Sequence, residues 1–267
     1  MSGLSIAQLA IFAVFSPPIL YLIYRHRRRG FLGWGYLLAF CILRITGGGL
    51  SINSSSAGAQ IISSIGLSPM LLSLDGILHE ARIYRNPDLN KRVEYTFMGF
   101  FHVLIATAVA MVGVGAGGLA GSQPKPSDLT DIKVGMALLE ASWVILVLWA
   151  LWSLSDGNHH HHHHHHTVPT AQELQGSMLL YGVLVVLVIE EIQILYFLVA
   201  EYTQHADLNP TTGSLAVRAV LNFLPELIGT LILVFVGIQT RHVHEHGSRP
   251  KQEGHGYGYS SHRSGLV

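Results

Sequence analysis

Seven stretches of the sequence are each predominantly apolar over about 20 residues, the length that an α-helix needs to cross the hydrocarbon core of a bilayer. They lie at roughly 5–24, 31–50, 59–79, 94–118, 132–154, 174–200 and 214–239. A chain that repeats this pattern so often buries its apolar residues in a membrane. The sequence therefore predicts an all-α membrane protein, a bundle of about seven transmembrane helices over residues 1–240.

The second and third stretches are the least apolar, so a bundle of six helices is the alternative. The second contains Arg44 and three glycines, Gly47, Gly48 and Gly49, and the third contains Asp75 and several serines. Only 12% of all residues are charged, against about 25% in ordinary soluble domains. Sixteen basic and sixteen acidic residues cancel, so the charge indicates no nucleic-acid partner and leaves the lipid bilayer as the expected one.

Basic residues gather in the connections on one side of the predicted bundle. The twelve on that side are Arg25, Arg27, Arg28, Arg29, Arg82, Arg85, Lys91, Arg92, Arg241, Arg249, Lys251 and Arg263. Only Lys125 and Lys133 lie on the other side. Because cytosolic loops of membrane proteins carry an excess of Lys and Arg, we expect the N-terminus outside and the C-terminus in the cytosol, in the plasma membrane or an endomembrane.

Two segments have few apolar residues to bury, and we expect both to be unstructured and cytosolic: a His-rich loop at 155–170 and a tail at 241–267. Imidazole suits zinc, copper and nickel, so their histidines are candidate metal ligands. These are His159, His160, His161, His162, His163, His164, His165 and His166 in the loop, and His242, His244 and His246 in the tail. The sequence favours a single-residue repeat in a loop without a ligand; the alternative is weak metal binding by the loop. No cofactor is expected.

Polar side chains within the apolar stretches are the candidate functional residues. An ionisable group at the centre of a bilayer costs about 2.5–3.5 kcal/mol on insertion scales, so it indicates a tertiary contact or a functional site. The candidates are Arg44, Asp75, Glu190, Glu191, Gln193, Asn222 and Glu226. A guanidinium keeps its proton in proteins, so Arg44 needs an acceptor, and the glycines after it let another helix come close. Glu226 is the favoured partner, followed by Glu191 and Glu190.

The stretches GFLGWGYLLAFCILRITGGGL, IISSIGLSPMLLSLDGIL and DLNPTTGS resemble a fungal group of seven-helix membrane proteins known only as a domain of unknown function. The resemblance runs over roughly residues 5–240 and includes the Leu-Arg-Ile around Arg44 and the mid-helix acid Glu226. It implies a seven-helix fold in a membrane and no established activity. Members of this group tend to have a basic residue in the sixth helix, where this chain has Glu190, Glu191 and Gln193.

Two interpretations of the intramembrane polar residues stay open. Arg44 and a carboxylate could clamp helices together, or several polar residues could form a pocket for a small, lipid-like ligand, as in a receptor or sensor. The alternatives are a membrane enzyme of the terpene-cyclase kind, which would use a buried carboxylic acid, and a proton- or cation-coupled transporter. The absence of HExxH, GxSxG and P-loop motifs argues against soluble-type hydrolase or kinase activity.

Overall fold

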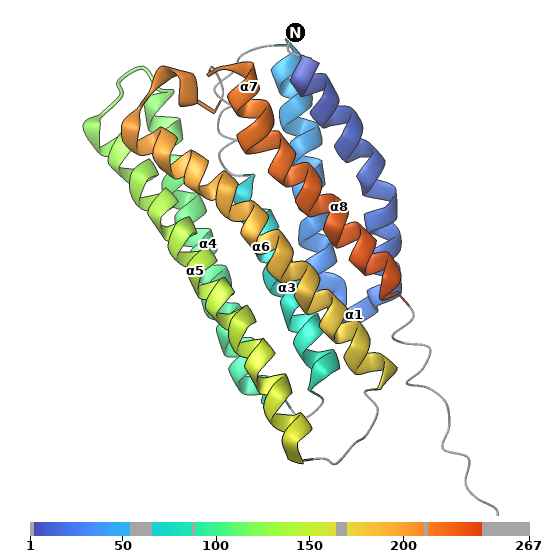
Figure 1. Cartoon of the computed structure of the whole chain (residues 1–267). Helices are drawn as coiled ribbons and strands as arrows, with labels where there is room; N and C mark the ends of the chain where they lie inside the picture. Colours follow the sequence, from blue (N-terminus) through green and yellow to red (C-terminus); the bar gives the residue numbers. More distant parts are fainter. Residues whose placement is uncertain (1–2, 54–65, 87–88, 164–169, 211–212, 242–267) are drawn as a thin grey trace, which may run out of the picture.

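The computed structural model describes residues 3–53, 66–86, 89–163, 170–210 and 213–241. These residues form helices joined by short connections, and none of them is in a strand. The helices pack side by side as an elongated bundle (Figure 1). In chain order they are α1 (Gly3–Asn53), α3 (Leu67–Arg85), α4 (Lys91–Leu119), α5 (Pro126–His163), α6 (Ala171–Thr203), the 3-10 helix η1 (Ala206–Leu208), α7 (Leu215–Val217), the π-helix η2 (Arg218–Phe223) and α8 (Leu224–Gln239).

α1 consists of two helices, because its backbone turns at Arg27 (φ 50°, ψ −140°). The halves, Gly3–Arg27 and Arg29–Leu50, lie side by side and run in opposite directions (Figure 1). A positive φ costs a non-glycine residue about 1–3 kcal/mol, so surrounding contacts must hold the turn. His26 supplies two of them: its Nδ1 lies 2.7 Å from Glu80 Oε1 on α3, and its Nε2 lies 3.1 Å from the carbonyl oxygen of Gly237 on α8.

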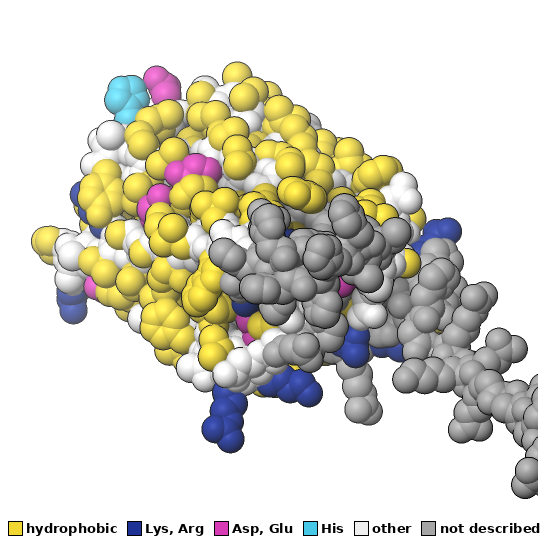
Figure 2. Space-filling view, turned by 60° about the horizontal axis from the view of Figure 1, so that its bottom comes forward, with side chains coloured by type: hydrophobic (Ala, Val, Ile, Leu, Met, Phe, Trp, Pro, Cys, Tyr) yellow, Lys and Arg dark blue, Asp and Glu magenta, His cyan; other side chains and the backbone are white. Residues whose placement is uncertain are grey.

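Seven helical passes run along the bundle: the two halves of α1, then α3, α4, α5, α6 and the continuous α7–η2–α8. Six of them are long and apolar enough to cross a membrane: Gly3–Arg27, Arg29–Leu50, Lys91–Leu119, Pro126–Ser155, Ala171–Thr203 and Leu215–Gln239. Large apolar side chains, among them Val14, Tyr24 and Val188, are exposed, and Figure 2 shows hydrophobic side chains over much of one face. The all-helical fold is therefore confirmed, while seven spans and their orientation stay predictions.

α3 is the pass that lacks the composition of a membrane span, since its 19 residues include Asp75, Glu80, Arg82 and Arg85. It packs against both α1 and α6 in the middle of the bundle (Figure 1). Fifteen of its 19 residues are buried. Protein therefore surrounds Asp75, Glu80 and Arg82, whereas Arg85 is half-buried, and the low hydropathy of this stretch has a structural reason.

The position of α3 differs from the expected third helix, residues 59–79. It begins at Leu67, with residues 59–65 outside the described part of the chain, and it continues to Arg85. The helix extends past residue 79 because Glu80 accepts hydrogen bonds inside the bundle, from Trp34 Nε1 and the Tyr84 hydroxyl, both at 3.0 Å. Trp34 belongs to α1 and Tyr84 to α3 itself, and without the contact from α1 the sequence around Glu80 resembles a charged loop.

α5 also extends beyond its predicted end, residue 154. It continues to His163, so His159–His163 prolong a helix and do not lie in the loop predicted at 155–170. No proline interrupts this part of the chain before Pro169, and the helical hydrogen bonds can continue. The candidate ligands His164, His165, His166, His242, His244 and His246 lie outside the described residues. Among the described residues, no group of three or more His, Cys, Asp or Glu could hold a metal ion.

Because successive passes alternate in direction, the connections collect at two ends of the bundle, called here the Gly3 end and the Arg27 end (Figure 1). The Gly3 end carries the connections around residues 120–125 and 204–214. The Arg27 end carries residues 86–90 and the end of α8. Gly3 and Gln239 thus lie at opposite ends, as an odd number of passes requires.

The second half of α1 crosses α3 at a close contact between two glycines. A Cβ atom added at Gly33 would lie 2.6 Å from the backbone nitrogen of Ile77, and one added at Gly76 would collide with the backbone of Gly33. Helices in membrane proteins commonly pack through such small residues. This crossing fixes the second half of α1 against α3 and thereby the position of Arg44, three turns farther along α1.

Candidate functional site

Five polar side chains from three passes meet inside the bundle and are called here the Arg44 cluster. They are Arg44 of α1, Glu190 and Gln193 of α6, Asn222 of η2 and Glu226 of α8. None of them is more than 5% exposed. Residues 190 and 193, like residues 222 and 226, are spaced by about one helical turn, so each pair presents both side chains on one face of its helix.

An ion pair and two amide hydrogen bonds connect the cluster. Arg44 Nη2 donates to Glu226 Oε1, so the partner that the sequence favours for Arg44 is the one in contact with it. Gln193 Nε2 donates to the same carboxylate oxygen, and it also lies 2.6 Å from Asn222 Oδ1. One carboxylate oxygen of Glu226 therefore joins α1, α6 and α8.

The local backbone around Pro225 helps to place Asn222 and Glu226. Proline has no N–H group and its ring crowds the carbonyl one turn earlier, so a regular helix is disturbed just before it. Here the six residues Arg218–Phe223 form a π-helix, and α8 begins directly after it with Pro225 in its first turn. Single π-turns occur frequently at functional sites. The irregularity brings Asn222 and Glu226 against Gln193 of α6.

Arg44 also contacts the beginning of α3. A Cβ atom added at Gly66, the N-cap residue of α3, would collide with the guanidinium group, so glycine leaves the space that Arg44 occupies. The N-terminus of a helix carries a partial positive charge and does not itself attract a cation. The guanidinium of Arg44 therefore depends on the carboxylate of Glu226, because the end of α3 offers it no compensating charge.

Several buried hydrogen-bonding atoms of the cluster have no partner among the described residues. They are Arg44 Nε, Glu190 Oε1, Gln193 Oε1 and Glu226 Oε2, together with the hydroxyl of Thr230 one turn after Glu226. Leaving a buried polar atom without a partner costs about 1–3 kcal/mol. The Glu190 carboxylate is confined as well, because a Cβ atom at Gly229 would lie only 3.0 Å from its Oε1. The cluster thus has more hydrogen-bonding capacity than its own side chains use.

Glu191 lies outside the cluster, although it follows Glu190 directly. It is half-buried at the surface of α6 and close enough to Glu140 of α5 to interact with its charge. Trp143 Nε1 donates to the carbonyl oxygen of Leu187 at 2.8 Å, and this bond joins the same two helices one turn away. The structure therefore does not bring Glu191 to Arg44, because adjacent residues on a helix point about 100° apart.

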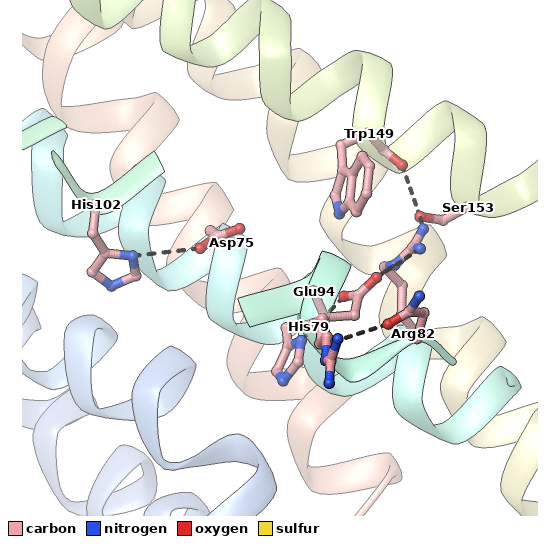
Figure 3. A network of polar contacts seen from close by, with 9 residues as sticks. Asp75, His79, Arg82, Glu94, His102, Trp149 and Ser153 are labelled. Carbon is pink, nitrogen blue, oxygen red and sulfur yellow. Dashed lines mark hydrogen bonds and ion pairs between the residues drawn. The ribbon is translucent and has the colours of Figure 1, made fainter. Parts of the chain in front are cut away.

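Asp75 also lies apart from Arg44, in a second polar network along α3 and α4 (Figure 3). Its Oδ2 is 3.8 Å from His102 Nδ1. One turn along α3, His79 Nδ1 lies 3.2 Å from Glu94 Oε2. Asp75 and His79 have the one-turn spacing of some metal ligands, but their neighbours here are one His and one Glu on α4.

The same network continues toward the Arg27 end through Arg82. Its Nε and Nη2 lie 2.9 and 2.8 Å from Glu94 Oε1, and its Nη1 donates to the Ser153 hydroxyl of α5. Its guanidinium carbon is 4.4 Å from the ring centre of Trp149. Sequence analysis missed Glu94 and Ser153 as partners, because both lie near the ends of apolar stretches. The sequence did offer one signal for this pair: an arginine, Arg82, and a carboxylate, Glu94, at the facing ends of two successive helices.

No curated protein and no solved structure matched the chain. The family comparison gave a match over residues 1–243, which include every member of the Arg44 cluster and of the Asp75 network. The chain belongs to the protein family described as a domain of unknown function (DUF7702).

Proposed function

We propose that the protein is a multi-pass membrane protein of the receptor or sensor type, and that the Arg44 cluster binds the polar group of a small, lipid-like ligand. The observation that carries the proposal is the set of buried cluster atoms without a partner among the described residues. Buried polar atoms in native proteins are nearly always paired, so such a group needs an explanation by a ligand or ordered water. A clamp made only of Arg44 and Glu226 would not need Glu190.

The chemistry of the cluster favours a hydroxyl-bearing ligand. Glu190 Oε1, Gln193 Oε1 and Glu226 Oε2 are acceptors, and Arg44 Nε is a donor. A hydroxyl group both donates and accepts, so it fits this mixture better than an anion, which the two carboxyl groups repel. Apolar helices surround the cluster, so the remainder of the ligand is apolar. A long-chain or polycyclic alcohol has both properties.

Photo-crosslinking tests the proposal. The full chain, purified in detergent micelles, is incubated with a long-chain alcohol that carries a photoactivatable diazirine and an alkyne tag, and is then illuminated. We expect labelled peptides from α6 and α8 and competition by excess unlabelled alcohol, but none by the alkane of equal length. Equal competition by the alcohol and by the alkane would refute the proposal, because labelling would then not depend on the hydroxyl group.

Two neighbouring residues provide a matched pair of variants. Glu190→Leu removes a buried acceptor of the cluster, whereas Glu191→Leu removes a half-buried carboxyl group that lies outside the cluster at the next position of the same helix. We expect the first change to reduce competable labelling at least about fivefold, the loss of about one hydrogen bond, and the second to leave it unchanged. Equal effects of both changes would show that labelling does not depend on the cluster.

A second candidate function, a proton- or cation-coupled transporter, is favoured by the Asp75 network. It places titratable side chains from His102 and Asp75 to His79 and Glu94 in succession along α3 and α4 (Figure 3). Acids and histidines inside membrane segments are typical of proton relays. The test is proton uptake into liposomes that contain the protein and a pH-sensitive dye. Transport should be lost in Asp75→Asn, and a rate equal to that of empty liposomes would exclude this candidate.

A further inference from the structure

A pocket of about 200 Å³ lies at the Gly3 end of the bundle, far along α6 from the Arg44 cluster. It is called here the end pocket. One wall is apolar and comes from α4 and α5, including Val112, Ala116 and Ile132. The other wall is polar and comes from the last turn of α6 and the connection after it, including Glu201, Gln204 and Asn209. No function discussed above uses it.

The connection that closes the end pocket is held by its own hydrogen bonds. Gly213 N donates to the carbonyl oxygen of Asn209 at 2.9 Å, and Ser214 N donates to that of Asp207 at 3.1 Å. A Cβ atom at Gly213 would lie 2.5 Å from both of these carbonyl oxygens, so only glycine fits there. The DLNPTTGS motif thus has a structural role: its Asp, Asn, Gly and Ser positions fix the wall of a pocket.

α6 ends at the pocket, and its C-cap residue Gln204 folds back onto the last turn. Gln204 takes up the left-handed conformation (φ 52°), and its N–H donates to the carbonyl oxygen of Ala200 at 3.0 Å. Its side chain returns to Glu201, with Nε2 2.7 Å from the backbone oxygen and 3.2 Å from Oε2. A residue in the left-handed conformation is a common way for an α-helix to end. The bonds from Gln204 hold the Glu201 carboxylate at the pocket.

The charges around the end pocket select a cation. Glu201 contributes a carboxylate, and the C-terminus of a long helix such as α6 carries a partial negative charge of about half an electron. None of the described residues that line the pocket is Lys or Arg. Lys133 lies near Glu201 but outside the lining, with its Nζ 5.4 Å from the ring centre of Tyr202. The imidazole of His205 also lines the pocket, so a bound cation would compete with Lys133 and with His205.

We infer that the end pocket binds a small organic molecule that carries a primary ammonium group on a short aliphatic body. The ammonium N–H groups donate to Glu201, and the aliphatic part contacts Ala116 and Ile132. The volume is below the 300–1,000 Å³ that is common for drug-sized ligands, so the body is small. A metal ion is not favoured, because the described residues contain no group of three ligands for one. The ammonium group could belong to a free amine or to the head group of an ethanolamine lipid.

Titration calorimetry on the full chain in detergent micelles tests this inference, with n-butylamine as the probe and n-butanol as its neutral match. We expect saturable binding of the amine and none of the alcohol. Glu201→Gln should weaken amine binding at least about tenfold, because it removes a charged acceptor. Asp207→Asn is the control, since it removes a carboxylate from the same connection but outside the pocket lining.

A second arm uses nanodiscs of phosphatidylcholine with or without phosphatidylethanolamine. Stabilisation of the wild type, but not of Glu201→Gln, by the ethanolamine lipid assigns the site to a lipid head group. Amine binding in detergent without this stabilisation by the lipid assigns it to a free amine. Ala116→Phe fills the pocket without changing its charge and should abolish either effect. The inference is overturned if the amine binds Glu201→Gln or Ala116→Phe as tightly as the wild type, or if neither arm gives a signal with folded wild-type protein.

Discussion

Arg44 and Glu226 lie 182 positions apart in the chain and form a buried ion pair between α1 and α8. Gln193 of α6 donates to the same carboxylate oxygen. The contact therefore exists only when the first and the last long helices of the chain have reached their places beside α6. This makes the pair a sensitive reporter of the complete fold.

A double-mutant cycle on this pair should reveal strong coupling. Arg44→Leu or Glu226→Leu alone leaves a buried charge without its partner and should cost about 3–5 kcal/mol of unfolding free energy. The double variant should recover much of this loss, because neither charge remains. The measurement is denaturant unfolding in detergent micelles. Strictly additive effects of the two changes would contradict a direct pair.

The two faces of α6 should respond in opposite ways to the loss of a polar side chain. Gln193→Leu removes a buried donor to Glu226 and Asn222 and should cost about 1–3 kcal/mol. Glu191→Leu replaces a half-buried carboxyl group outside the cluster and should leave the melting temperature unchanged or raise it. Thermal unfolding in lipid nanodiscs compares the two. Destabilisation by Glu191→Leu equal to that by Gln193→Leu would mean that residue 191 also faces the interior.

Glycine at the crossing of α1 and α3 should be irreplaceable. In Gly76→Ala the added methyl group collides with the Gly33 backbone, which cannot shift without moving a helix, so a loss of about 1–3 kcal/mol is expected. Gly99→Ala on α4 is the control, since nothing lies within 4 Å of its added Cβ atom. The control should be neutral or slightly stabilising because alanine favours helices. A normal melting temperature of Gly76→Ala would argue against the close crossing.

Membrane orientation can be tested with single cysteines. Cys41, the one cysteine of the chain, is buried, so a Cys41→Ser background is suitable. New cysteines at Lys125 and Lys91 lie at opposite ends of the bundle. If the N-terminus is outside, a membrane-impermeant maleimide added to intact cells should label position 125 and not position 91. Labelling in the reverse pattern would invert the predicted orientation.

The helices and the Arg44–Glu226 pair could both be predicted from the sequence, for related physical reasons. Apolar length determines where a chain can cross a bilayer, and an arginine within such a length needs an acceptor at similar depth. The sequence could not show that Glu190 faces the interior of the bundle and Glu191 does not. The reason is that α6 is apolar on all sides, so the spacing of its apolar residues does not mark an inner face.

The partners of the charged residues of α3 could not be predicted from the sequence, for another reason. Glu80, Arg82 and Glu94 lie at the ends of apolar stretches, where charged side chains ordinarily indicate a loop. Only the tertiary structure shows that Trp34 and His26 meet Glu80 and that Arg82 meets Glu94. The end pocket could not be predicted from the sequence either, since it depends on how one connection folds over three helix ends.

The burial of α3 has a consequence for biogenesis. The charged residues of α3 disfavour its release from the translocon into lipid. The helices that cover α3 include α6, which leaves the ribosome only after α4 and α5. We therefore expect α3 to stay beside the two halves of α1 until later segments shield Asp75 and Glu80. On this expectation, integration into the membrane is completed only with the C-terminal helices, and truncation before α6 should send the nascent chain to membrane quality control.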